Sequence, residues 1–139
     1  MRAHLLIFPS IVAIGISTAT QAQTVTFTNM IECAGYAAMA EDRELSNQLL
    51  ASSLETGLEI YEARHAATAY DAPGVVDDFG PTAEAAFAVG VGYVASQQSV
   101  LDVANEDPDY NTASERRQIR VDIAQRLFSE ARCDRFSDG

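Results

Sequence analysis

The sequence predicts an all-α fold, a compact antiparallel four-helix bundle with one disulfide joining helix 1 and helix 4. Three observations lead to this prediction. Apolar residues recur at helical spacing in segments separated by polar or helix-breaking residues. The chain begins with the pattern of an export signal, and export permits disulfides. Cys33 and Cys133, its two cysteines, lie at opposite ends of the expected mature domain, so their pairing links the first helix to the last.

Residues 1–22 have the composition of a secretory signal peptide. Arg2 is followed by an apolar stretch to Ile16, and then by small and polar residues up to a predicted cleavage after Ala22. The apolar stretch is too short to span a bilayer comfortably. We therefore expect removal of residues 1–22, a single helical domain over residues 23–139, no membrane insertion, and a secreted protein of the bacterial periplasm.

The chain is strongly acidic and contains no lysine. Its 139 residues include 20 aspartates and glutamates against nine arginines, so its formal net charge is −11, and loss of Arg2 takes the charge to −12. Repulsion between like charges disfavours nucleic acids and anionic membranes as partners. A protein partner with a basic surface fits this charge.

The first two helices meet at a boundary that the local sequence marks weakly. Threonine alternates with apolar residues over Thr24–Thr28, which predicts a short lead-in strand. Asn29 then predicts the cap of a helix over residues 30–42. A second helix is expected over residues 44–70, ended by the turn at Pro73. Its apolar stripe consists of Leu45, Leu49, Leu50, Leu54, Leu58 and Tyr61.

The cysteines favour a break between these two helices. Helix propensity alone allows one long helix over residues 30–70. In the three-helix fold that results, Cys33 and Cys133 would lie at opposite ends. In a four-helix up-down bundle, the start of helix 1 and the end of helix 4 lie at the same end. We therefore expect a disulfide, rather than free thiols or an intermolecular bridge, and a turn near residues 42–47 with Ser46 or Asp42 as its cap.

The third helix is predicted from a cap at Thr82 to about Ala104. Gly90 and Gly92 lie inside it, where each glycine costs about 1 kcal/mol relative to alanine. A close approach of a neighbouring helix would explain both, and a ligand-lined surface is the alternative. The bulky side chains of this helix are Phe87, Val91, Val94, Val100 and Leu101.

The fourth helix begins at the strongest local signal in the chain. Thr112 and Glu115 have the spacing of a capping box, and the helix is expected to continue to about Arg135. Arg116, Arg117 and Arg120 cluster in its first turns. They are interpreted as partners of nearby acids such as Glu106, Asp107 and Asp109, and an anion bound with the helix N-terminus is the alternative.

A metal site has weak support. Asp107, Asp109 and Asn111 match the start of a calcium-binding loop, and Glu115 is a further candidate ligand. The pattern then fails, because Thr112 stands where the loop needs glycine. A turn leading into the capping box explains the same residues. These four are retained as metal candidates only, and the sequence indicates no cofactor.

Catalytic constellations are absent from the sequence pattern. Glu62 and His65 form one Glu-x-x-His, whereas dimetal bundles use two such motifs, and no serine or cysteine has a histidine in a recognisable motif. The sequence therefore favours a non-enzymatic interaction protein: an accessory subunit, an inhibitor or immunity-type binder, or a stress-protective factor. Its partner is expected to be a protein, contacted first through residues 71–82 and 105–111. The alternative is a helical bundle that binds a small ligand or a metal.

Overall fold

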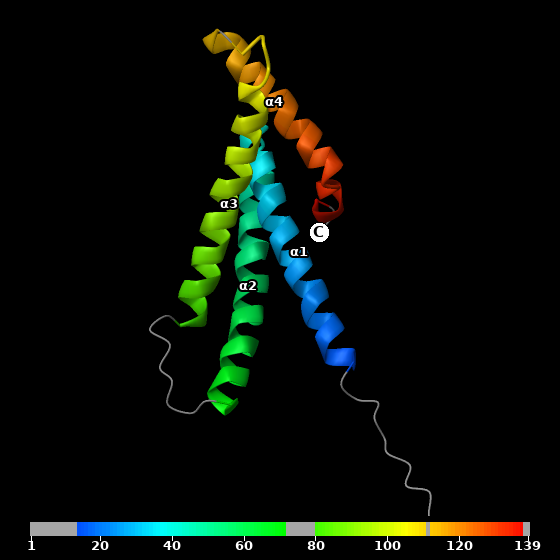
Figure 1. The fold of residues 1–139 in the computed structure, drawn as a ribbon, viewed down its shortest axis with the longest axis vertical. Coiled ribbons are helices and arrows are strands. Elements are labelled where there is room, and N and C mark those ends of the chain that lie inside the picture. Colours follow the sequence, from blue (N-terminus) through cyan, green and yellow to red (C-terminus); the bar gives the residue numbers. More distant parts are fainter. Residues whose placement is uncertain (1–13, 72–79, 111, 138–139) are drawn as a thin grey trace, which may run out of the picture.

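Four helices and one 3-10 turn form the part of the chain that the structure describes. The structure is a computed structural model that describes residues 14–71, 80–110 and 112–137, with the side chains of residues 21–67, 80–110 and 112–137. The elements are α1 (Ile14–Met39), α2 (Arg43–Asp71), α3 (Pro81–Asn105), α4 (Ala113–Glu130) and η1 (Cys133–Phe136). Successive helices run antiparallel (Figure 1), which confirms the all-α prediction. None of the described helices combines the length and hydropathy that crossing a membrane requires.

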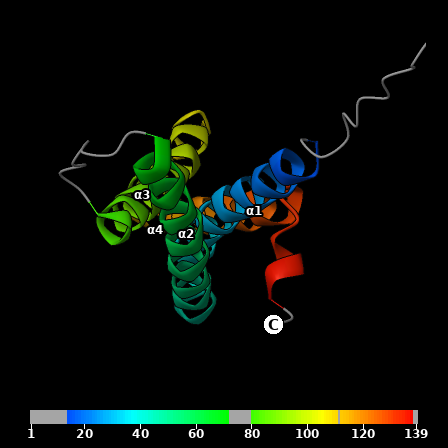
Figure 2. The ribbon, with the colours of Figure 1, turned by 90° about the horizontal axis from the view of Figure 1, so that it is seen from below.

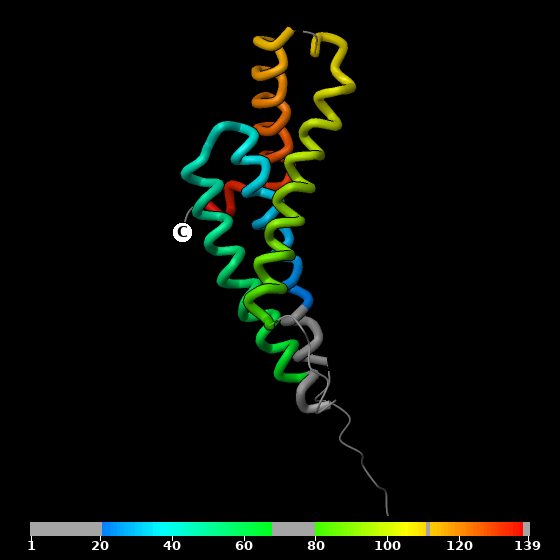
Figure 3. Tube along the Cα trace, turned by 90° about the vertical axis from the view of Figure 1, so that its left-hand side faces the viewer, coloured from blue at the N-terminus to red at the C-terminus, as the bar shows by residue number. Residues whose placement is uncertain are grey.

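Three long helices pack against one another, and the shorter α4 covers one end of them. It packs against α1 and α3, beside the last turns of α3 (Figure 3). The main core lies at this end and contains Cys33, Ala34, Tyr36, Leu49, Val100, Ala104, Ile123, Ala124 and Cys133. A smaller cluster further along the bundle contains Phe27, Ile31 and Val89. Toward that far end, α1 and α3 diverge (Figures 1 and 2).

The predicted lead-in strand is wrong, because Thr24–Thr28 lies inside α1. Asn29 is not a cap for the same reason, since the helix already begins at Ile14. The hydroxyls of two threonines in this segment donate to carbonyls four residues earlier, at about 3.0 Å, so the helix satisfies them internally. Phe27 is 6 % exposed and packs in the smaller core cluster. Tertiary packing of this side chain outweighs the weak local preference for extended backbone.

The predicted break between the first two helices is confirmed. Glu41 has a positive φ of 67°, which ends α1 in a left-handed residue. Asp42 then caps α2, since its Oδ1 accepts a hydrogen bond from the amide of Leu45 at 3.1 Å. Ser46, the other predicted cap, donates instead to the carbonyl of Ala34 at 2.9 Å and is buried.

The disulfide is confirmed, and its position corrects the predicted end of helix 4. The Cα atoms of Cys33 and Cys133 lie 5.5 Å apart, within the range that a bridge requires. α4 ends at Glu130 rather than near Arg135, because Arg132 adopts a left-handed conformation with φ 55°. Cys133 therefore lies in η1, and Cys33 lies in the second half of α1 instead of its first turn.

The buried face of α2 differs from the predicted leucine stripe. Leu49 is buried, but Leu54 is 41 % exposed. Ser53 and Gly57 occupy the buried positions instead. A Cβ at Gly57 would lie 2.7 Å from the ring of Phe27, so the small residue is what lets that ring approach. Small residues on the buried face of α2 let the neighbouring helices come close. Leu54 therefore lies at the edge of this face.

α3 begins one residue before the predicted cap. Its N-cap is Gly80, with extended backbone and no side-chain cap, and Pro81 occupies the first turn, where a missing N–H costs nothing. Thr82 is therefore inside the helix and caps nothing. The preceding residues 72–79 lie outside the described part of the chain.

Candidate functional site

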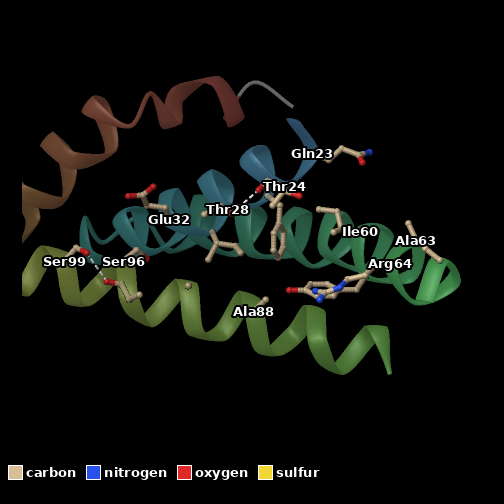
Figure 4. Close-up of a pocket in the computed structure, with 16 residues that line it drawn as sticks. Gln23, Thr24, Thr28, Glu32, Ile60, Ala63, Arg64, Ala88, Ser96 and Ser99 are labelled. Carbon is tan, nitrogen blue, oxygen red and sulfur yellow. Dashed lines mark hydrogen bonds between the residues drawn. The ribbon is translucent and has the colours of Figure 1, made fainter. Parts of the chain in front are cut away.

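An elongated groove opens where α1 diverges from α2 and α3. Its volume is about 990 Å³. Phe27 and Ile31 of α1, Ile60 of α2, and Ala88 and Gly92 of α3 supply apolar lining. Polar groups lie at its two ends. Figure 4 shows Glu32, Ser96 and Ser99 toward one end, and Gln23 and Arg64 toward the other.

Close helix contacts fix the shape of this groove. A Cβ at Gly92 would lie 2.8 Å from Cγ2 of Ile31. The lack of a side chain at residue 92 therefore lets α1 and α3 come into contact. This confirms the predicted close approach for Gly92. The same prediction is wrong for Gly90, where an added Cβ would meet no heavy atom within 4 Å. Gly92 also lines the groove, and the alternative of a ligand-lined surface stays a prediction.

An exposed apolar row continues outward from the groove along α3. Ala95 lines the groove, Val91 lies one turn before it, and Phe87 one turn before that, so these residues share one helix face. Phe87 is 74 % exposed, Val91 53 % and Val94 63 %. Of the bulky side chains of this helix, these three therefore lie outside the core, whereas Val100 is buried. We call Phe87, Val91 and Val94 the outer row.

Tyr36 contacts Glu32, which lies toward one end of the groove. Its hydroxyl donates to Oε1 of Glu32 at 2.6 Å, and Glu32 lines the groove. Burial, then the hydrogen bond to this carboxylate, raises the pKa of Tyr36 well above its ordinary value. The phenol therefore stays protonated and fixes the orientation of Glu32.

A second, more polar depression of about 460 Å³ lies at the α1–α2 turn beside α4. Arg43, Arg117 and Arg120 line it together with Glu41. Arg117 forms a two-point salt bridge with Glu41, through Nε and Nη2. This bond, aided by the charges of Arg120 and Arg43, lowers the pKa of Glu41.

The metal candidates are engaged in local turn and cap contacts. Asp107 accepts the amide of Asp109 at 2.9 Å. Thr112 is the predicted cap of α4, since its Oγ1 accepts the amide of Glu115. The carboxylate of Glu115 bonds the Thr112 hydroxyl, whereas a full capping box uses the backbone N–H of the cap. Asn111 lies outside the described residues. Across the described residues, no three His, Cys, Asp or Glu side chains are grouped so as to hold a metal.

The remaining predicted site residues are spread over the bundle. His65 pairs with Glu84 of α3, with Nε2 and Oε2 3.2 Å apart, and Glu62 is exposed. Arg116 bonds the carbonyl of Tyr110 and lies over its ring. Neither His65 nor a cysteine is among the residues that line the groove. The α3–α4 turn lies at the end of the bundle away from the groove (Figure 1).

Comparison with known proteins gives no relative. No family model, no curated protein and no solved structure matches the chain. The function is therefore argued from the groove and its surroundings alone. Sequence reasoning found neither the groove nor the outer row, and a sequence signal was available for the outer row alone. Phe87, Val91 and Ala95 repeat every four residues on a different face of α3 from the buried Val89, Ser96 and Val100.

Proposed function

We propose that this protein is a non-catalytic, exported binding protein whose groove and outer row receive one amphipathic helix of a partner protein. The single observation that supports this proposal is the continuity of apolar surface from the groove through Ala95 to Val91 and Phe87. Helix-in-groove recognition uses an apolar face with side chains at i, i+3, i+4 and i+7. Three neighbouring helices that supply the groove walls suit such a face.

The outer row favours a protein over a small molecule. A small ligand is largely enclosed by its pocket, so it would leave Phe87 and Val94 uncovered. Contiguous exposed apolar side chains on a globular surface are typical of protein interaction sites. The groove by itself, at about 990 Å³, lies at the upper end of the range for small-ligand pockets.

Charge indicates the chemistry of the partner. The chain has a net charge of −11, and long-range attraction would accelerate its encounter with a basic surface. We infer a partner helix with an apolar face flanked by lysine or arginine. Its basic flanks would face the acidic surface outside the groove. Association should weaken as salt concentration rises, because exposed charges are screened.

Position-specific crosslinking tests this proposal. A photoreactive benzophenone amino acid at Val91 is expected to crosslink one protein in the producing cells, whereas the same group at exposed Glu130 of α4 is not. The purified partner should then bind the purified protein. Val91→Asp should weaken that binding at least about tenfold without unfolding the exposed site. Glu130→Gln serves as the matched surface control and should bind normally.

Three results would count against a partner helix. Equal crosslinking from Val91 and Glu130 would show that the outer row is not specific. A crosslink only to a second copy of this chain would make the surface a homodimer interface. A small molecule retained in native mass spectrometry and lost with Ile60→Asp would favour the small-ligand alternative, with the groove as its site.

A further inference from the structure

The depression beside α4 gathers three guanidinium groups around one carboxylate. Arg43 follows the α1–α2 turn, and Arg117 and Arg120 lie one turn apart on α4. Ala38, Met39 and Val121 complete the lining. The formal charge of the lining is +3 − 1 = +2, counting the three arginines and Glu41. Three of the nine arginines of a chain with net charge −11 therefore converge at one place.

Two of these arginines form no ion pair with an acid in the part of the chain that the structure describes, and an acidic partner was predicted for one of them, Arg120. Arg117 is paired with Glu41. No ion pair joins Arg43 or Arg120 to a described acid, although Arg120 is half-buried. Arg120 was expected to pair with acids before α4, and Asp107 instead accepts an amide of its own turn. Glu41 compensates part of the positive charge of the depression, and the lining keeps a formal charge of +2.

The nearest acids in sequence, Asp42 and Glu44, form no ion pair with the three arginines. Asp42 precedes Arg43, but its carboxylate oxygen accepts the amide of Leu45 in the cap of α2. Glu44 follows Arg43 and is not among the residues that line the depression. The bond from Glu41 holds Arg117 in a defined orientation. Glu41 occupies Nε and Nη2 of Arg117. The planar guanidinium groups of Arg43 and Arg120 are therefore the ones that can match the oxygen geometry of phosphate and sulfate.

We propose that Arg43, Arg117 and Arg120 form a binding site for one doubly charged oxyanion of the phosphate or sulfate class. The anion would lie over the apolar floor between the α1–α2 turn and α4, and its two charges would balance the net charge of the lining. Arg43 and Arg120 would contact it directly, and Arg117 would add charge while bonded to Glu41. This site is independent of the groove, because the two linings share no residue.

Titration followed by amide and arginine-side-chain NMR tests the site. Inorganic phosphate, added to the full mature chain at constant ionic strength with chloride as reference, should give saturable shifts at Arg43, Arg117 and Arg120. Arg120→Gln should weaken binding at least about fivefold, since a charge-assisted hydrogen bond is lost. Arg126→Gln, which removes an exposed arginine elsewhere on α4, should leave binding unchanged.

A second arm separates a free ion from a phosphoryl group on a larger molecule. Glycerol 1-phosphate replaces inorganic phosphate, and tighter binding of the ester would place part of the ligand on Met39 and Val121. Weaker binding of the ester would indicate a free ion. The proposed site would be contradicted by chemical shifts that do not saturate with phosphate or that chloride reproduces. It would also be contradicted if Arg126→Gln weakened binding as much as Arg120→Gln. Arg43→Gln, at an exposed position, repeats the test if Arg120→Gln impairs folding.

Discussion

Gly35 of α1 lies against Ser96 of α3 with no room for a side chain. A Cβ at Gly35 would lie 1.7 Å from Oγ of Ser96, 2.8 Å from its Cβ and 3.1 Å from the backbone oxygen of Tyr93. Rotating the serine hydroxyl removes only the first overlap. Any side chain at residue 35 would therefore push the two helices apart.

We expect Gly35→Ala to destabilise the fold by about 3 kcal/mol, because overpacking here meets backbone as well as side chain. The measurement is the free energy of unfolding from urea denaturation followed by circular dichroism. Adding Ser96→Gly should recover part of the loss, since it removes two of the three contacts. A cost below about 0.5 kcal/mol for Gly35→Ala would contradict the packing described for these helices.

Gly90 and Gly92, two residues apart in α3, should respond oppositely to alanine. Gly90→Ala should stabilise by about 1 kcal/mol, because alanine is the better helix former and nothing lies near the new methyl. Gly92→Ala brings a methyl 2.8 Å from Ile31. This overlap should outweigh the gain in helix propensity, so that the fold is destabilised by about 1 kcal/mol in total. Thermal unfolding of the two variants side by side measures the difference. Equal shifts in the two midpoints would argue against the α1–α3 contact at Gly92.

The glycines also show how far the sequence leads. A pattern of helix-breaking residues predicts that a close contact exists, but it cannot say which glycine makes it. That choice depends on the rotation of α3 about its axis, which places Gly92 against Ile31 and Gly90 in solvent. The same rotation exposes Phe87 and Val94. The outer row was therefore out of reach of a count of apolar residues.

The covalent signal was a better guide than the local ones, since the caps predicted at Asn29 and Thr82 are both wrong. The pairing of Cys33 with Cys133 is present, and it is this pairing that favoured the break between the first two helices, where Asp42 caps α2. The groove depends on the divergence of α1 from α3, which no local signal encodes. The strand predicted at Thr24–Thr28 is wrong, because burying the Phe27 ring against Gly57 stabilises the helix. This stabilisation exceeds the local preference of the alternating residues for extended backbone.

Removing the disulfide should weaken the fold strongly. The bridge closes a loop with a sequence separation of 100, for which the chain-entropy model gives about 4–5 kcal/mol. The double substitution Cys33→Ser with Cys133→Ser should lower the urea midpoint accordingly. Dithiothreitol should lower the midpoint of the wild-type protein and leave the double variant unchanged. Two reactive thiols in the unreduced protein would contradict the bridge.

Lowering the pH should remove the stabilisation that the Glu41–Arg117 ion pair gives to the fold. The folded-state pKa of Glu41 lies below its ordinary value of 4.5, chiefly because Arg117 bonds to it. A carboxyl with a lowered folded pKa stabilises the fold fully above its unfolded pKa, and this stabilisation is lost as pH falls through the folded pKa. The difference in unfolding midpoint between wild type and Glu41→Gln should therefore shrink below pH 4.5. Arg126→Gln, whose contact with Glu130 is longer at 3.9 Å, is the control pair. A difference that grows on acidification would contradict this assignment.

The two threonines near helix starts give a test of capping. Thr112 is the N-cap of α4, and its Oγ1 accepts the amide of Glu115 at 3.3 Å. Thr112→Ala should therefore cost about 1 kcal/mol. Thr82 is exposed inside α3, whose N-cap is Gly80, so Thr82→Ala should change stability by less than about 0.5 kcal/mol. Urea denaturation of both variants decides the matter. An equal cost at both positions would mean that α3 begins at Thr82, as its sequence alone suggests, and that Pro81 lies in the loop before it.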